Sequence, residues 1–238
     1  MKLGVIGGLG PIATAYFLEL IIKMTDVSCD QDHLDMIIYN TPSTPDRTAY
    51  ILGKSNQSPV TSMIQTGHNL VQQNVDIIAI PCITAHYFYE ELSIAINRPI
   101  INVIVQTALQ LKQFGIETVG ITATDGTLAG QIFQKELDTF GITSVLPSPR
   151  MQMNVMKLIY DDIKAGRPIE MNIFNDISEE LRRNGAQAII LGCTELSLIK
   201  RDCDIGAGYI DAMEVLAKAS IESCGAPLKQ EYRCLISS

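Results

Sequence analysis

Five short, mainly apolar segments recur along the chain, and amphipathic stretches of helix length separate them. These segments cover residues 3–6, 35–39, 75–80, 118–122 and 188–191. Short runs that stay apolar at successive positions are typical of strands buried on both faces, as in parallel sheets. The alternation therefore predicts βαβ units and an α/β fold in which helices cover both faces of parallel sheets.

The same order of elements occurs twice. The first apolar segment leads into a turn at residues 7–10 (GGLG), and the fourth leads into a turn at residues 123–127 (ATDGT). Later in each half, a strand ends near a cysteine followed closely by threonine, at Cys82 in AIPCITAHYF and at Cys193 in IILGCTELSL. Ligands bind at the carboxyl ends of strands in open parallel sheets, so two facing lobes would bring both thiols to one cleft.

This repeat predicts two pseudo-twofold-related, Rossmann-like lobes with parallel sheets and an active site in the cleft between them. We expect the first lobe to contain residues 1–98 and to be completed by residues 209–238. The second lobe is expected to contain residues 99–208.

Charge and hydropathy exclude several functional classes. The 238 residues include 26 acidic and 18 basic side chains, giving a net charge of −8 without a basic cluster, so a nucleic-acid partner is not expected. No apolar stretch approaches the roughly 18 residues of a membrane span, and the N-terminus lacks the pattern of a signal peptide. We expect a cytoplasmic protein that does not enter a membrane.

The first turn matches the G-x-G-x-x-A pattern of dinucleotide-binding folds at Gly8, Gly10 and Ala13. Such folds also place an acidic residue at the end of the second strand, whereas this strand ends at Asn40. We therefore expect the backbone around Gly8, Leu9 and Gly10 to approach a small carboxylate ligand rather than a nucleotide.

Two cysteines on opposite sides of a cleft suit racemisation, because one thiolate removes a proton from a carbon while the opposite thiol returns one. An ordinary thiol is mostly protonated at neutral pH, and we expect the helix that follows Cys82 or Cys193 to stabilise the thiolate through its N-terminus. The spacing of the other cysteines indicates neither disulfides nor a metal site, and we expect structural thiols at Cys29, Cys203, Cys224 and Cys234. The three histidines, His33, His68 and His86, also lack metal-ligand spacing.

Six motifs spread over the chain resemble those of the aspartate/glutamate racemase superfamily: LGVIGGLGP, TPDRT, PCITAHYF, TATDGT, IKAG and GCTE. The glutamate racemases carry Gly-Cys-Thr-His at the second cysteine, whereas Glu195 follows Thr194 here, so the chain resembles the aspartate racemase branch. The resemblance implies a homodimeric enzyme that interconverts L- and D-aspartate without pyridoxal phosphate, metal or another cofactor. It also makes glutamate a second candidate substrate.

The resemblance also assigns roles to individual residues. It implies that Cys82 and Cys193 are catalytic, and that Arg47 and Lys164 hold the side-chain carboxylate of the substrate. The threonines and the second turn are expected to donate to the α-carboxylate. The remaining substrate-binding positions that we predict are Gly8, Leu9, Gly10, Ile83, Thr84, Thr124, Gly126, Thr127, Thr194 and Glu195.

Ile83 departs from the family pattern, which usually has asparagine after the first cysteine. Isoleucine lacks the amide that would hydrogen-bond the bound amino acid, and the loss of such a partner weakens discrimination between substrates. Two alternatives therefore stay open. One is a related enzyme acting on another small carboxylate, such as a hydantoin racemase, a maleate isomerase or an arylmalonate decarboxylase. The other is a carboxylate-binding protein without activity.

Overall fold

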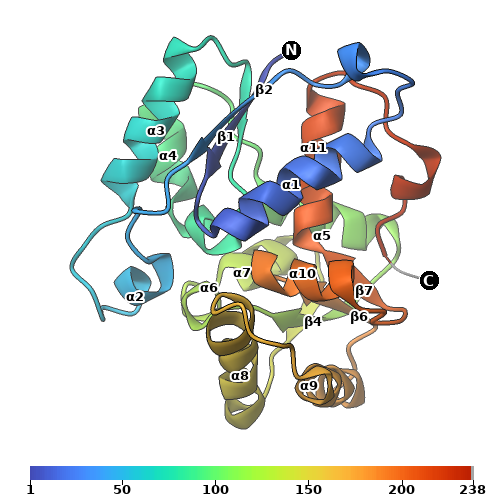
Figure 1. Ribbon diagram of the computed structural model, residues 1–238. Coiled ribbons are helices and arrows are strands. Elements are labelled where there is room, and N and C mark those ends of the chain that lie inside the picture. The colour runs from blue at the N-terminus through green and yellow to red at the C-terminus, as the bar shows by residue number, and fades with distance from the viewer. Residues whose placement is uncertain (237–238) are drawn as a thin grey trace.

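Two separate parallel sheets organise the chain, as the computed structural model of residues 1–236 shows (Figure 1). The first has the order β2-β1-β3 and consists of β1 (Leu3–Gly7), β2 (Met36–Asn40) and β3 (Ile77–Ala79). The second has the order β5-β4-β6-β7 and consists of β4 (Thr118–Thr122), β5 (Thr143–Val145), β6 (Ala188–Leu191) and β7 (Tyr209–Asp211). We call the parts built around these sheets the first and second lobes.

Helices fill the segments between the strands. The first half contains α1 (Pro11–Met24), α2 (Arg47–Ile51), α3 (Val60–Gln72), α4 (Tyr89–Ile96) and α5 (Val103–Gln113), with 3₁₀-helices η1 (Asp30–Asp32) and η2 (Ile83–Phe88). The second half contains α6 (Asp125–Ala129), α7 (Ile132–Thr139), α8 (Pro149–Met156), α9 (Met171–Arg183), α10 (Thr194–Asp202) and α11 (Ala212–Ser223). It also contains the π-helix η3 (Lys157–Ile163) and the 3₁₀-helix η4 (Gln230–Tyr232).

The predicted α/β class and parallel pairing are confirmed. All five residues of β1 are buried, and β1 pairs in parallel with both of its neighbours, as expected for a central strand covered on both faces. The strand predicted over 75–80 is shorter, since β3 covers only Ile77–Ala79. The strands β5 and β7 have three residues each, too few to show a periodic pattern, and the sequence did not predict them.

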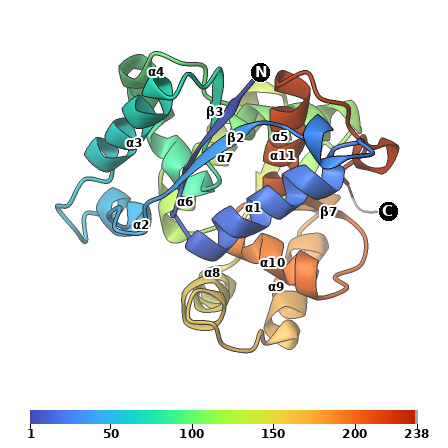
Figure 2. The ribbon, with the colours of Figure 1, turned by 45° about the horizontal axis from the view of Figure 1, so that its top comes forward.

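Helices cover both faces of the first sheet (Figures 1 and 2). Helices α3 and α4 lie on one side, where their apolar residues share a core with Ile6 of β1 and Ile78 of β3. Helices α1 and α11 lie on the other side, together with α5. This second core also contains Val119 and Ile121 of β4, so a continuous apolar layer joins the two lobes.

The C-terminal segment contacts both lobes. Strand β7 pairs with β6 and completes the second sheet, and α11 then packs against α1 and α5. Residues 209–211 thus belong to the second sheet as β7, and the chain reaches the first lobe only with α11. The division of the chain into lobes at residue 209 stays a prediction. Within residues 1–236, no helix has the length and hydropathy needed to span a membrane.

Candidate active site

The two predicted cysteines line one small cavity between the lobes. Cys82 follows β3 and precedes the first turn of η2, while Cys193 follows β6 and occupies the N-cap position of α10. Both side chains are buried, with 6% and 5% exposure. The cavity encloses about 10 Å³, which is room for about one water molecule. Its lining consists of Leu9, Asp46, Arg47, Thr48, Cys82, Ile83, Thr84, Thr124, Tyr160, Lys164, Cys193, Thr194 and Glu195.

Cys193 is held as a hydrogen-bond donor to a carboxylate. Its Sγ lies 3.0 Å from Glu195 Oε2, and the hydroxyl of Thr194 donates to the same oxygen at 3.3 Å. Burial raises the pKa of the Cys193 thiol well above its ordinary value, and the Glu195 carboxylate raises that pKa further. Lys164 and the backbone N–H of Glu195 act in the opposite direction without reversing the shift. The expected stabilisation of this thiolate by the helix N-terminus is therefore present but outweighed.

Glu195 also packs against the first turn. A Cβ on Gly10 would lie 2.6 Å from Glu195 Oε1, so the glycine leaves room for this carboxylate in its present position. Gly8 has φ +87°, and its N–H donates to the Thr14 hydroxyl within the turn. Leu9 lines the cavity, whereas Gly8 and Gly10 do not. In this structure, the carboxylate that approaches the turn at Gly10 therefore belongs to the protein itself.

Arg47 is buried beside Cys82, with 7% exposure. Its Nη2 donates to Leu9 O at 2.6 Å, and its Nη1 donates to Pro45 O at 3.1 Å, so the guanidinium fastens the first turn to α2. Its Nε is buried without a hydrogen-bond partner. Burial opposes the charge, but the Cys82 sulfur and Asp46 raise the pKa of Arg47 above its ordinary value. Arg47 thus places a fixed positive charge next to Cys82.

A tyrosine that the sequence analysis did not single out closes the cavity. Tyr160 lies on η3 of the second lobe, and its hydroxyl donates to Asp46 Oδ2 of the first lobe at 3.3 Å. Lys164 Nζ lies 4.4 Å from the centre of the Tyr160 ring and 3.8 Å from Glu195 Oε1. Burial raises the pKa of Tyr160 to about 12, so its hydroxyl stays a donor at neutral pH.

Three threonine hydroxyls tie the lobes together at another wall of the cavity. Thr84 Oγ1 lies 3.0 Å from the hydroxyls of both Thr124 and Thr127, and those two lie 3.1 Å apart. Nearby, a Cβ on Gly126 would lie 2.8 Å from the Cα of Thr48. Thr127 and Gly126 do not line the cavity and instead allow the close approach of the lobes.

The structure therefore brings ten of the predicted site residues to one cavity and places four beside it. The four are Gly8, Gly10, Gly126 and Thr127. Sequence reasoning missed three lining residues: Asp46, Thr48 and Tyr160. Asp46 was detectable as a helix N-cap, because its carboxylate accepts from Ala49 N at 2.7 Å, but no sequence pattern marked Tyr160.

His86 lies outside the cavity lining. Its Nδ1 lies 3.1 Å from Cys82 O, and burial lowers the pKa of its imidazole. His86 therefore supports the backbone at Cys82 as a neutral ring. Within residues 1–236, no group of three or more histidine, cysteine or acidic side chains is arranged to hold a metal ion.

Comparisons with known proteins identify a family for the chain. Residues 6–220 match the family described as Asp/Glu/Hydantoin racemase. The chain is 32% identical to the solved aspartate racemase of Picrophilus torridus, with a TM-score of 0.86 over 98% of both chains. It is also 26% identical to the broad specificity amino-acid racemase RacX of Bacillus subtilis, over 93% of this chain and 97% of that protein.

A more distant likeness concerns the fold alone. Glutamate racemase from Francisella tularensis, solved in complex with D-glutamate, is 18% identical with a TM-score of 0.68, over 100% of this chain and 84% of that one. The match over residues 6–220, together with a relative aligned along nearly its whole length, shows that the chain belongs to the Asp/Glu/Hydantoin racemase family and is an isomerase.

Proposed function

We propose that the protein racemises aspartate through two-base proton transfer between the substrate Cα and the Cys82 and Cys193 thiols. The observation that carries this proposal is that one cysteine from each lobe lines the same buried cavity. The likeness to the Picrophilus torridus aspartate racemase supports the choice of substrate.

In this mechanism one cysteine is a thiolate and takes the Cα proton, forming a carbanion whose charge spreads into the α-carboxylate. The other cysteine is a thiol and delivers its proton to the opposite face of Cα. Reversing the two protonation states runs the reaction in the opposite direction. Atoms and charge balance, because one proton enters the substrate for each proton removed.

The charges around the cavity suit a dicarboxylate. Aspartate brings two carboxylates and one ammonium group. The lining offers two cations, Arg47 and Lys164, together with the carboxylates of Asp46 and Glu195. Arg47 has one N–H without a partner, and Lys164 is 27% exposed in its side chain, so both retain donors for a ligand. Charge-assisted hydrogen bonds of this kind are stronger than neutral ones.

Substrate entry requires the cavity to open, because it holds only about one water molecule. The contact between Tyr160 and Asp46 crosses from one lobe to the other at this point. We infer that this contact breaks on entry and forms again around the ligand, which excludes water from the carbanion.

The decisive experiment follows the Cα hydrogen of L-aspartate by proton NMR in D₂O, together with the optical rotation. The wild-type enzyme should exchange this hydrogen and form D-aspartate. Cys82→Ala and Cys193→Ala should each abolish racemisation in both directions, since each turnover needs both thiols. Either variant should retain solvent exchange from the one enantiomer whose hydrogen faces the remaining thiolate.

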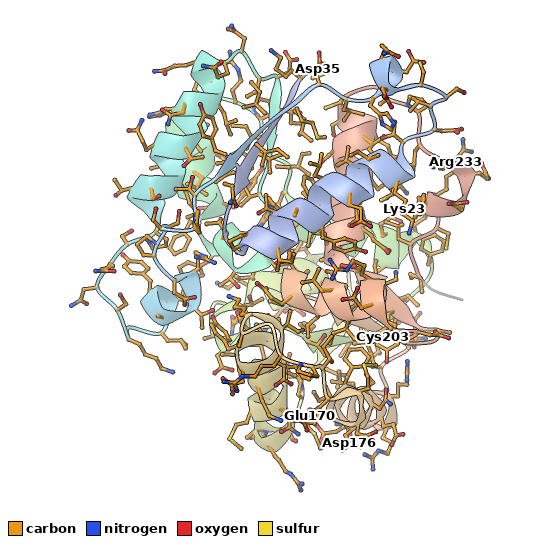
Figure 3. The ribbon with its side chains drawn as sticks, viewed as in Figure 1. Lys23, Asp35, Glu170, Asp176, Cys203 and Arg233 are labelled. Carbon is orange, nitrogen blue, oxygen red and sulfur yellow. The ribbon has the colours of Figure 1, made fainter. Side chains whose placement is uncertain are left out.

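Cys203→Ala is the matched control, because this cysteine lies at the far end of α10 and outside the cavity (Figure 3). It should racemise at the wild-type rate. Wild-type rates in both Cys82→Ala and Cys193→Ala would refute the mechanism. Absence of exchange in the wild-type protein would refute aspartate as its substrate.

Ile83 supports a second candidate substrate class, the neutral amino acids. It contributes an apolar side chain to the cavity wall, and the RacX relative is described as having broad specificity. The same exchange assay with alanine, leucine and methionine tests this class. Faster exchange with these than with aspartate would replace the first candidate by the second.

A further inference from the structure

The two thiols have unequal electrostatic surroundings, although each follows a strand in the same way. Cys193 donates to the Glu195 carboxylate at 3.0 Å, and Glu195 is 2% exposed. Cys82 instead lines the cavity beside the buried Arg47 guanidinium, and the two groups interact electrostatically. Lys164 and Tyr160 extend over the cavity from the η3 segment, and both interact electrostatically with Cys193.

We propose that Glu195 keeps the proton on Cys193 in the resting enzyme and leaves Cys82 as the cysteine that gives up its proton first, so that the free enzyme is ready to deprotonate only one enantiomer. The proposal rests on the two-base function above. Glu195 is a positioning residue in this scheme, because it acts through Cys193.

The charge balance of the cavity supports this assignment. A thiolate at Cys193 would place two negative charges 3.0 Å apart in a buried site, an arrangement that low dielectric penalises strongly. Lys164 Nζ is 3.8 Å from Glu195 Oε1 and compensates one of these charges. The second charge is better placed at Cys82, where the Arg47 guanidinium is the neighbour. Arg47 also interacts with the Asp46 carboxylate in the same lining, so it compensates a charge at Cys82 only in part.

The consequence is an order of events. The Cys82 thiolate takes the Cα proton from the enantiomer that presents it, and the Cys193 thiol delivers its own proton to the opposite face. The enzyme is left with a thiol at Cys82 and a thiolate at Cys193 beside Glu195. This form is the less stable one, and it returns to the resting state when Cys193 regains a proton and Cys82 loses one.

The test measures thiolate reactivity without any substrate. Wild-type protein is treated with iodoacetamide at pH 6 to 9, and the modification of each cysteine is followed by peptide mass spectrometry. At pH 7, Cys82 should react at least tenfold faster than Cys193. The Cys193 rate should rise about tenfold per pH unit, because only the thiolate reacts. Both thiols share one cavity, so slow entry of the reagent affects both.

Variants then assign the asymmetry to Glu195. Glu195→Gln should increase Cys193 alkylation at pH 7 at least tenfold, and Glu195→Asp should restore most of the wild-type profile. The matched control is Glu170→Gln. Glu170 lies at the outer end of the second lobe, and its carboxylate pairs with the Lys157 ammonium group (Figure 3). This control should leave both rates within twofold of wild type. Circular dichroism and the melting temperature establish that each variant is folded.

Equal alkylation of Cys82 and Cys193 in the wild-type protein would overturn the proposal even if no variant folds. An unchanged Cys193 profile in folded Glu195→Gln would overturn it as well. Failure of the aspartate assay, by contrast, leaves these rates untouched, so the two proposals fail separately.

Discussion

Replacement of Arg47 by methionine tests whether this buried cation supports the fold as well as the substrate. Methionine keeps much of the aliphatic volume but removes the donors to Leu9 O at 2.6 Å and Pro45 O at 3.1 Å, together with a longer contact to Thr44 O at 3.4 Å. Hydrogen bonds to charged groups contribute about 1.5–3 kcal/mol each, so the two shorter bonds together contribute about 3–6 kcal/mol. Partial relaxation of the two carbonyls toward water leaves an expected loss of about 3 kcal/mol.

Urea unfolding followed by circular dichroism measures this loss. A slope of about 2–3 kcal/mol per molar urea converts it into a midpoint shift of roughly 1 M. The control is Arg98→Met, which removes donors to Val75 O and Asn97 O near the surface and should cost less than about 1 kcal/mol. An Arg47→Met protein with the wild-type midpoint but no racemase activity would show that the guanidinium serves only the ligand, and the reasoning would be wrong.

Three further predictions concern other parts of the molecule. Burial raises the pKa of Asp211 to about 7, so the unfolded chain releases this proton at a lower pH than the folded chain does. The stability of the fold therefore falls as pH rises from about 4 to 7. Asp211→Asn should make the melting temperature less dependent on pH between 5 and 8, and an unchanged dependence on pH would contradict this. Gly126→Ala places a Cβ 2.8 Å from the backbone of Thr48, and by separating the lobes it should lower the free energy of unfolding by about 1–3 kcal/mol, as measured with urea. Gly53→Ala is the control, because a Cβ there meets no atom within 4 Å and the positive φ of +67° reports backbone strain alone. Ile83→Asn should raise kcat/KM for aspartate by restoring the polar group common in the family, and no change in rate would remove Ile83 as a determinant of specificity.

The sequence predicted the parts of the fold that depend on local pattern. The segments 118–122 and 188–191 coincide with β4 and β6, because buried parallel strands are mainly apolar and lack the alternation of half-exposed strands. The two cysteine turns were recognisable for the same reason, since each directly follows such a strand. The three-residue strand β7 gave no signal, because its place in the sheet depends on pairing with β6 rather than on its own composition.

The site was predictable in its members but not in their pairing. Gly10 and Glu195 are separated by most of the chain, and no local pattern indicates that the carboxylate occupies the space of a missing Cβ. Tyr160 was missed because its role comes from the position of η3 across from Asp46, which only the arrangement of the lobes sets. The helix N-terminus at Cys193 led to the wrong sign for its pKa, because burial and the neighbouring Glu195 outweigh the backbone N–H.

The small volume of the closed cavity affects how isotopes travel through the enzyme. With room for about one water molecule, the thiol that has just received the substrate hydrogen has few partners with which to exchange it before the cavity opens. At high substrate concentration, the next molecule to enter can then receive the hydrogen taken from the previous one. In D₂O, hydrogen removed from one substrate molecule would therefore reappear in a later product. Deuterium would enter the amino-acid pool more slowly than the enantiomers interconvert.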